Sequence, residues 1–361
     1  MSDDQTPSRP LFEHFPRLVG NLPFVELGEF PTPVKPLESL AKKIGVTDLW
    51  AKCDDISASV YGGNKIRKLE FLLAAAIEQG CSSVLTFGGL GSNHALATSI
   101  FCQRLGLQCI AILTPEPATA AVRKTLRYHR HLGTRLEVAN RYADARATAD
   151  RIREEAGAEN VYEIEFGGSS WVGTIGFVNA GLEVAGQIAA HEIPEPDVIY
   201  LGCGTAGSTA GLALGIQLGG LNTRIEAIQV TPESIQPKQL FEQLFFETGR
   251  RLHTLDDAVK RARLSTACVN IRQDQLGEGY AIPTEAAIEA ANLMLQMENM
   301  PASLTYTGKT MAALIADARA GLLAGKRILF WNTFNSRPYP ALPDDDSWLE
   351  LPEGLHYIFK D

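Results

Sequence analysis

The sequence predicts an α/β protein with two lobes. Each lobe is expected to be a mostly parallel, twisted sheet with helices on both faces, with an active site in the cleft between the lobes. Three observations predict this class. Short apolar or β-branched runs alternate with helix-like stretches. The 361 residues are enough for about two domains of roughly 150 residues each. The 32 glycines suit the tight strand-to-helix turns that such a fold requires.

The first half of the chain carries one series of strands and helices. Apolar residues from Ile66 to Ile77 recur at helical spacing, and Gly80 marks the end of that helix. A second helix is expected over Ala95–Leu105. The strands are expected at Val84–Phe87, Cys109–Leu113, Leu136–Val138 and Val161–Ile164.

The second half repeats this alternation. Strands are expected at Val198–Leu201, Ile225–Val230 and Arg327–Trp331, with helices near Thr209–Leu218, Ser234–Thr248, Thr284–Glu298 and Lys309–Ala324. The two series predict a larger, cofactor-binding domain made of residues 1–60 and 176–361, and a smaller domain made of residues 61–175. The last stretch, Pro338–Asp361, is rich in proline and aspartate and is expected to be a surface tail that wraps its domain.

The composition argues against several classes of protein. Lysine and arginine number 33 and aspartate and glutamate 42, so the net charge is −9, which is unfavourable for binding nucleic acid or an anionic membrane surface. No apolar run reaches the roughly 18 residues of a membrane span, and the N-terminal MSDDQTPSRP is not expected to be a signal peptide. The six cysteines include no C-x-x-C pair, which indicates reduced thiols in a cytoplasmic protein and no metal site.

The first of three polar loops, Gly62–Leu69, leads into a helix whose first turn carries Lys65. A helix N-terminus is positive, and Arg67 and Lys68 add further positive charge, so the neutral form of the Lys65 amine is favoured. A neutral lysine is a nucleophile toward aldehydes. The alternative is a solvated, basic N-terminus of a surface helix.

The second loop, Phe87–His94, follows a predicted strand and opens a predicted helix. Backbone N–H groups at the helix start, together with the side chains of Ser92 and Asn93, make a small anion site that suits a substrate carboxylate. The alternative is an ordinary helix cap after a glycine turn, although three glycines exceed what a cap needs.

The third loop, Gly202–Thr209, also joins a strand to a helix. Its residues Gly202–Gly207 match G-x-G-x-x-G, so a nicotinamide-dependent oxidoreductase has to be considered. The acidic residue expected at the end of the next strand is missing, because that strand ends in Gln229-Val230. The loop also carries three hydroxyl groups, which suit the many oxygens of a terminal monophosphate.

Together the three loops meet the needs of pyridoxal 5′-phosphate and an amino acid. The cofactor aldehyde needs a lysine, its phosphate needs the Gly/Ser/Thr loop, and the substrate carboxylate needs the Ser/Asn helix start. The same chain resembles the 1-aminocyclopropane-1-carboxylate deaminase / D-cysteine desulfhydrase family, within the tryptophan-synthase-β-like fold. The resemblance runs from Phe30 to about Trp331, and its most specific blocks are Gly63–Glu70, Gly88-Gly89 with Ser92–His94, Gly204–Thr209, Gly277–Pro283 and Tyr306–Lys309.

The resemblance implies roles for particular residues. Lys65 resembles the Schiff-base lysine, and Ser92, Asn93 and His94 resemble the substrate-binding residues, with Asn93 also beside the cofactor. Tyr280 and Tyr306 match two active-site tyrosines, although each has an alternative in simple packing. The remaining cofactor-binding residues implied are Asn64, Thr205, Ala206, Gly207, Ser208, Thr209 and Thr307, the last facing the pyridine nitrogen.

Two positions discriminate within the family. Its deaminases have glutamate where Thr307 stands and glutamine where His94 stands, so this chain carries the desulfhydrase-like pair. A threonine hydroxyl implies a weaker electron sink than a carboxylate, which suffices when a good leaving group departs from Cβ. The chain also departs from the family at Gly91, Leu96 and Cys53, and it reads Asn332–Ser336 where a Gly-Gly pair is usual.

These observations predict a pyridoxal-phosphate-dependent amino-acid lyase. It is expected to catalyse α,β-elimination, giving a keto acid and ammonia, with Lys65 as the base at Cα and a tyrosine near Cβ. A small amino acid and a second copy of the chain are the expected partners, with no nucleic acid and no membrane. The alternatives are a 1-aminocyclopropane-1-carboxylate deaminase, a nicotinamide-dependent oxidoreductase, and a non-catalytic binding protein of the same fold.

Overall fold

The structure is a computed structural model that describes residues 9–264, 268–339, 341–342 and 346–360. The expectation about a signal peptide concerns an N-terminal stretch that lies almost entirely outside the described residues. The described chain forms two compact units. The larger unit contains residues up to 22, 28–68 and 171–337, and the smaller unit contains residues 23–27, 69–170 and those from 338 on.

The larger unit is built on a six-stranded sheet with the order β1-β2-β10-β7-β8-β9. Only β1 is antiparallel to its neighbour β2, and the other pairs are parallel. Its strands are β1 (Val34–Pro36), β2 (Asp48–Cys53), β7 (Val198–Cys203), β8 (Arg224–Gln229), β9 (Val269–Arg272) and β10 (Arg327–Asn332). Its helices are α1 (Pro10–His14), α2 (Glu38–Ile44), α7 (Trp171–Ala189), α8 (Gly207–Leu218), α9 (Pro237–Leu255), α10 (Glu285–Glu298) and α11 (Thr307–Arg319).

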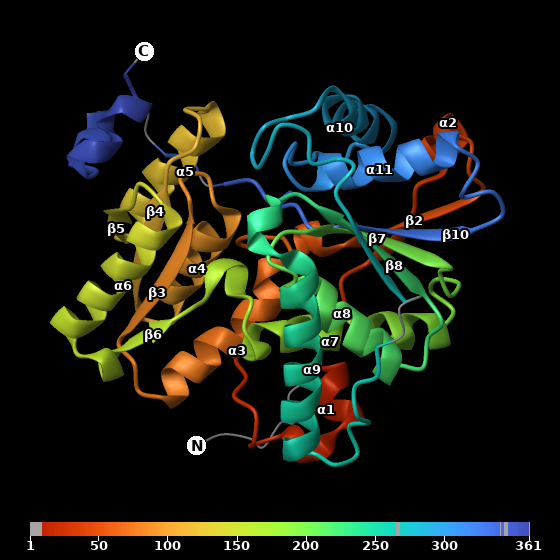
Figure 1. Ribbon diagram of the computed structural model, residues 1–361, viewed down its shortest axis with the longest axis horizontal. Helices are drawn as coiled ribbons and strands as arrows, with labels where there is room; N and C mark the ends of the chain where they lie inside the picture. The colour runs from red at the N-terminus through yellow and green to blue at the C-terminus, as the bar shows by residue number, and fades with distance from the viewer. Residues whose placement is uncertain (1–8, 265–267, 340, 343–345, 361) are drawn as a thin grey trace. The chain divides into compact units, whose positions relative to one another are not determined.

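Helices cover both faces of this sheet because successive strand residues point to opposite sides. Val198 and Tyr200 of β7 and Phe330 of β10 pack with residues of α2, α10 and α11 in one buried cluster. On the opposite face, the Trp331 ring lies 5.7 Å from the ring of Phe177 in α7. Figure 1 shows α10 and α11 on one side of the sheet and α7 and α8 on the other.

The smaller unit is built on a four-stranded sheet, all parallel, with the order β5-β4-β3-β6. Ile110 and Ile112 of β4 pack against α6, and the alternate residues Ala111 and Leu113 pack with α4 and α5. Its strands are β3 (Ser83–Gly89), β4 (Gln108–Thr114), β5 (Arg135–Val138) and β6 (Val161–Glu163), and its helices are α4 (Asn93–Arg104), α5 (Ala120–His131) and α6 (Tyr142–Ala156). The helix α3 (Lys65–Glu78) begins in the larger unit and continues into the smaller one.

The compact units group four segments differently from the domain boundaries expected from sequence, 1–60 with 176–361 and 61–175. Residues 61–68, with Lys65, and residues 171–175 group with the larger unit, whereas residues 23–27 and the described residues from 338 on group with the smaller unit. The C-terminal residues group there because of apolar packing: Leu351, Leu355 and Ile358 are buried in one cluster with Val122 and Leu126 of α5. This tail therefore completes a core, which is a closer association than that of a surface wrapping.

The mixed α/β class with mostly parallel sheets is confirmed, and so is the helical cover on both faces of each sheet. All six cysteines are free thiols; five are buried, and Cys268 is exposed. Within the part of the chain that the structure describes, no helix combines the length and the apolarity that crossing a membrane requires.

Candidate active site

Lys65 is the first residue of α3, and a tightly held loop delivers it there. The Gly62 N–H donates to Oδ1 of Asn335 over 2.7 Å, and the Gly63 N–H donates to the Asp54 carbonyl over 2.7 Å. Gly63 has φ +98°, which only glycine adopts without strain, and a Cβ at Gly62 would lie 1.8 Å from the Asp55 carbonyl oxygen. The two glycines are therefore required by the path of the backbone just before the lysine.

The amine of Lys65 is shifted toward its neutral form. Burial removes water from the ammonium group and lowers the pKa of Lys65 to about 8. The direction confirms the sequence argument, but the physical cause is burial. Arg67, which was expected to repel Lys65, is neutralised by two buried carboxylates, because it pairs with Asp54 at 2.7 Å and with Glu183 at 2.9 Å.

Lys68 is a second buried amine, one helical turn after Lys65. It is 1% exposed, and its pKa is lowered well below the usual value, first by burial and then by the charge of Lys65, while the nearby thiol of Cys203 acts in the opposite direction. Cys203 ends β7 and lies in the third polar loop, Gly202–Thr209. Lys68 thus places a buried amine beside that loop. The sequence analysis considered Lys68 only as a positive charge that repels Lys65.

The loop after β7 reaches the helix α8 through a strained turn. Ala206 has φ +60°, an uncommon conformation for a residue with a Cβ and one that concentrates at functional sites. Thr209 is completely buried, and its hydroxyl has no regular hydrogen-bond partner among the described residues, although it interacts with the thiol of Cys203. Such a hydroxyl, next to backbone N–H groups at a helix start, suits the oxygens of a phosphate.

One hydrogen bond joins the lysine loop to this loop. The Asn64 side chain donates from Nδ2 to the Ser208 Oγ over 3.3 Å, and both residues are buried. Asn64 immediately precedes Lys65, so the amine-bearing residue and the hydroxyl-rich loop belong to one connected cluster of the larger unit.

Two tyrosines and a threonine belong to the same unit. The hydroxyls of Tyr280 and Tyr306 lie 3.2 Å apart, and their rings meet edge to face at 6.0 Å. The Tyr306 hydroxyl lies 3.4 Å from where a Cβ of Gly204 would stand, so it borders the third loop. The Thr307 hydroxyl accepts the Ser303 N–H over 2.8 Å and donates to the Ser303 carbonyl over 3.3 Å.

Ser92, Asn93 and His94 lie in the smaller unit, where they open α4. The Ser92 Oγ accepts the Ala95 N–H over 3.2 Å, so the cap expected as the alternative is present. Sequence reasoning missed Glu116, whose carboxylate accepts the Gly91 N–H over 2.8 Å. Burial raises the pKa of Glu116, and that contact lowers it again in part.

A buried ionic network lies next to the lysine helix. Arg67 bridges Asp54 and Glu183, and Lys52 donates to Glu183 over 2.5 Å. Burial alone would raise the pKa of Glu183, but the charges of Arg67 and Lys52 outweigh it and lower that pKa to about 2. The sequence signal for this network is Glu183 itself, a single carboxylate in the largely apolar stretch of α7.

The fold and this cluster define a class of protein: an α/β enzyme in which a lysine of lowered pKa lies near a loop that suits a phosphate group. A family model described as pyridoxal-phosphate dependent enzyme matches residues 25–333, and the chain belongs to this family. Its cofactor is pyridoxal phosphate. This cofactor carries a single phosphate, which agrees with the monophosphate interpretation of Gly202–Gly207; the role of that loop stays a prediction.

Individual relatives refine this assignment. The D-cysteine desulfhydrase of Salmonella choleraesuis (strain SC-B67) is 33% identical over 301 residues, which cover 81% of this chain and 88% of the relative. The crystal structure of an ACC deaminase homologue is 28% identical with a TM-score of 0.76, and covers 90% of this chain and 95% of its own. The processed form of threonine deaminase isoform 2 from Solanum lycopersicum, 15% identical with a TM-score of 0.62 over 98% of this chain and 96% of its own, shares the fold.

The residues present fit pyridoxal phosphate. The Lys65 amine is held half-buried with a lowered pKa, as attachment of an aldehyde requires. The buried Thr209 hydroxyl and the helix start at Gly207 offer hydrogen bonds to a phosphate. These assignments of individual residues remain predictions.

Proposed function

We propose that this protein is an amino-acid lyase that acts on D-cysteine, with the overall reaction D-cysteine + H2O → pyruvate + H2S + NH3. The observation that carries the proposal is the Asn64–Ser208 hydrogen bond, which connects the lysine to the phosphate loop. The similarity to D-cysteine desulfhydrases over 81% of the chain supports the choice of substrate. The cofactor, when bound, withdraws electrons from the substrate Cα and so makes its proton acidic.

The Lys65 nitrogen accepts the Cα proton in this proposal. A pKa of about 8 leaves a useful neutral fraction of the amine at physiological pH, and burial keeps competing water away from it. The same amine holds the cofactor before the substrate arrives. The Lys65→Ala variant is therefore expected to lose at least about 10²-fold in kcat.

The Tyr280–Tyr306 pair donates the proton that the departing thiolate requires. Two phenols 3.2 Å apart can share one hydrogen bond, so one hydroxyl can donate while the other supports it. In the Ser92 loop, Asn93 and the N-terminal amides of α4 form an arrangement suited to a carboxylate.

The surroundings of Thr307 favour elimination over cyclopropane opening. Its hydroxyl is engaged by the Ser303 backbone, and no carboxylate occupies this position of the sequence. A hydroxyl stabilises a protonated pyridine nitrogen less than a carboxylate does, so the electron sink is weaker. Elimination of a thiol, which leaves Cβ readily, requires less stabilisation of the carbanion by the electron sink than opening of a cyclopropane ring does.

An assay of keto-acid and sulfide release tests the proposal. Purified protein should be yellow, and it should release pyruvate and sulfide from D-cysteine in equal amounts. D-Cysteine, L-cysteine and 1-aminocyclopropane-1-carboxylate are compared at equal concentration. Release from the cyclopropane and none from either cysteine would contradict the proposal.

The second candidate is 1-aminocyclopropane-1-carboxylate deaminase, because the ACC deaminase homologue aligns with 90% of this chain. The same assay decides between the two activities, since the cyclopropane gives a keto acid without sulfide. We also propose that the enzyme works as a homodimer in the cytoplasm, which sedimentation analysis and cell fractionation test.

A further inference from the structure

The segment after β10 contacts the loop that carries Lys65. It runs from Thr333 to Arg337, and its central residue, Asn335, is 8% exposed. This is the region where the chain departs from the family it resembles, in which a Gly-Gly pair is usual. In the structure, its polar groups bind backbone atoms of residues 54–64.

Asn335 makes the most direct of these contacts. Its Oδ1 accepts the Gly62 N–H over 2.7 Å and the Arg337 N–H over 3.0 Å. Its Nδ2 donates to the Arg337 carbonyl over 3.3 Å. Because both donors to Oδ1 are backbone N–H groups, the orientation of the amide is fixed by its partners.

Neighbouring residues of the segment extend this attachment. The Asn64 N–H donates to the Thr333 carbonyl over 3.4 Å, and the Ser336 N–H donates to the Asp55 carbonyl over 3.0 Å. A Cβ at Gly63 would lie 3.2 Å from the Thr333 carbonyl oxygen, so the two backbones approach closely. Of these contacts, the one at Gly62 depends on a side chain and can be removed by substitution.

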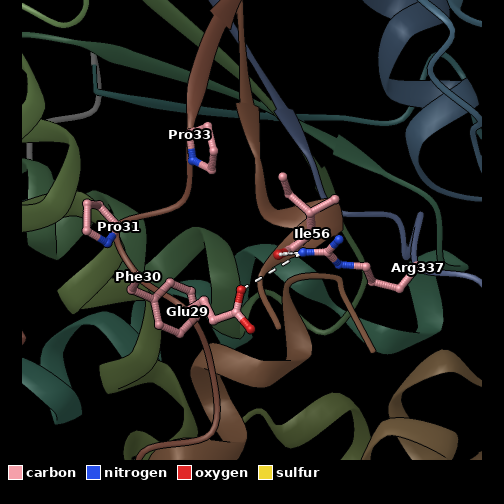
Figure 2. Close-up of a pocket in the computed structure, with 6 residues that line it drawn as sticks. All are labelled: Glu29, Phe30, Pro31, Pro33, Ile56 and Arg337. Carbon is pink, nitrogen blue, oxygen red and sulfur yellow. Dashed lines mark hydrogen bonds and ion pairs between the residues drawn. The ribbon is translucent and has the colours of Figure 1, made fainter. Parts of the chain in front are cut away.

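A shallow cavity of about 290 Å³ lies where Arg337, the last residue of this segment, meets Ile56. Figure 2 shows Arg337 reaching the Ile56 carbonyl there, with Glu29 on the opposite side. Arg337 also donates to the Ala58 carbonyl over 3.0 Å, and its pair with Glu29 spans 4.0 Å at a more exposed position. The Glu29 side chain therefore belongs to the same surface, while the contact of Glu29 with residues 54–64 is made by its main-chain N–H, which donates to the Ser57 carbonyl over 2.7 Å.

We propose that Asn335 is a positioning residue for Lys65. Its Oδ1 accepts the buried N–H of Gly62, three residues before the lysine. This contact fixes the direction in which the chain enters α3, and therefore the orientation of the Lys65 amine toward the cofactor. Without this acceptor a buried donor is left unsatisfied, which is costly enough to move the loop. The inference rests on the proposed attachment of the cofactor to Lys65.

The test compares the holoenzyme with Asn335→Leu, which removes the acceptor, and Asn335→Asp, which keeps an oxygen at the same place. Two properties are measured: the rate of cofactor loss on dialysis, and the pH midpoint of the absorbance band of the bound cofactor. We expect Asn335→Leu to lose cofactor at least about tenfold faster and to shift the midpoint by at least about 0.5 pH unit. Changes of this size correspond to the loss of one buried hydrogen bond. Asn335→Asp should restore most of both properties.

Glu29→Gln is the matched control, because it changes the same surface without removing a contact to the loop, and it should behave as the wild type. If Asn335→Leu does not fold, Asn335→Ala replaces it as the smaller perturbation. Variants that only melt at lower temperature, with unchanged cofactor loss and midpoint, would overturn the inference. Absence of cofactor from Lys65 in the wild type would instead overturn the proposed function.

Discussion

At the scale of single residues, Lys65 illustrates how position sets reactivity. An exposed lysine is almost fully protonated at neutral pH and reacts slowly with aldehydes. Burial of Lys65 lowers its pKa to about 8, while the charge of Arg67 is taken up by Asp54 and Glu183. The chain therefore carries, close together in sequence, one buried cation that is strongly stabilised and one amine that readily gives up its proton.

The pH dependence of cofactor loading tests this assignment. The pKa of Lys65 is lowered in the folded protein, so the neutral, reactive form increases as the pH rises through about 8. The rate at which apoenzyme attaches pyridoxal phosphate should rise about tenfold per unit below this pH and level off above it. Stopped-flow absorbance measures the rate, and a midpoint near that of a free lysine would contradict the account.

At the scale of secondary-structure elements, the packing of α7 against α8 supports the loop of residues 205–209, which is predicted to bind the phosphate. The two helices approach through glycines, since a Cβ at Gly215 would lie 2.3 Å from the Val178 carbonyl and one at Gly211 would lie 2.3 Å from the Thr174 carbonyl. α8 begins at Gly207, directly after the strained Ala206. Close helix contact therefore fixes the start of α8, where the phosphate is predicted to bind.

Substitution of one glycine in this contact should be costly. Gly215→Ala forces the helices apart and is expected to destabilise the protein by about 1–3 kcal/mol. Gly186→Ala in α7 is the control, because no atom lies within 4 Å of its Cβ position and alanine favours a helix, so its stability should be unchanged or higher. Thermal denaturation measures both variants, and equal melting temperatures would contradict the close-packing argument.

Most elements with strong periodicity could be predicted from the sequence, but several others could not. The expected strands at Val84–Phe87 and Val198–Leu201 correspond to β3 and β7; β3 is longer by one residue at its start and two at its end, and β7 by two at its end. β2 was missed because it reads DLWAKC, where a buried Lys52 interrupts the apolar pattern. Its charge is compatible with the core because Glu183, far away in sequence, pairs with it, and because the Thr32 carbonyl and the Gln187 side chain accept its hydrogen bonds.

The residues of the candidate site could likewise be predicted from the sequence only in part. Lys65 and the loop of residues 205–209 stood out because glycines and hydroxyls cluster next to predicted helix starts, which is a local signal. Asn335 and Glu116 act through single contacts to the backbone of distant loops. No local pattern encodes such a contact, so it becomes visible only when the fold brings the segments together.

At the scale of the whole molecule, stability depends on the buried ionic network. It joins β2, α3, α7 and the residues after β2, and Trp331 of β10 donates to Asp54 over 2.8 Å. Removing one partner from a buried network leaves an uncompensated charge, which is more costly than losing the attraction itself. The network therefore links the segments on which Lys65 and its loop depend.

Glu183→Gln should lower the free energy of unfolding by about 3–5 kcal/mol. Glu289→Gln, which breaks an exposed pair with Arg319, is the control and should have no measurable effect. Because the pKa of Glu183 is lowered in the folded state to about 2, its contribution is present above the usual carboxyl range and is lost as the pH falls toward 2. The variant should thus lose much of the acid sensitivity seen in wild-type denaturation curves, and identical curves would argue against this role.

The central claim is that the amine of Lys65 holds pyridoxal phosphate. Borohydride reduction of the purified holoenzyme, followed by proteolysis and mass spectrometry, tests it most directly. The account predicts a single reduced phosphopyridoxyl adduct on the peptide that contains Lys65, and no such adduct in the Lys65→Ala variant. An adduct on Lys68 or on another lysine, with Lys65 unmodified, would contradict it.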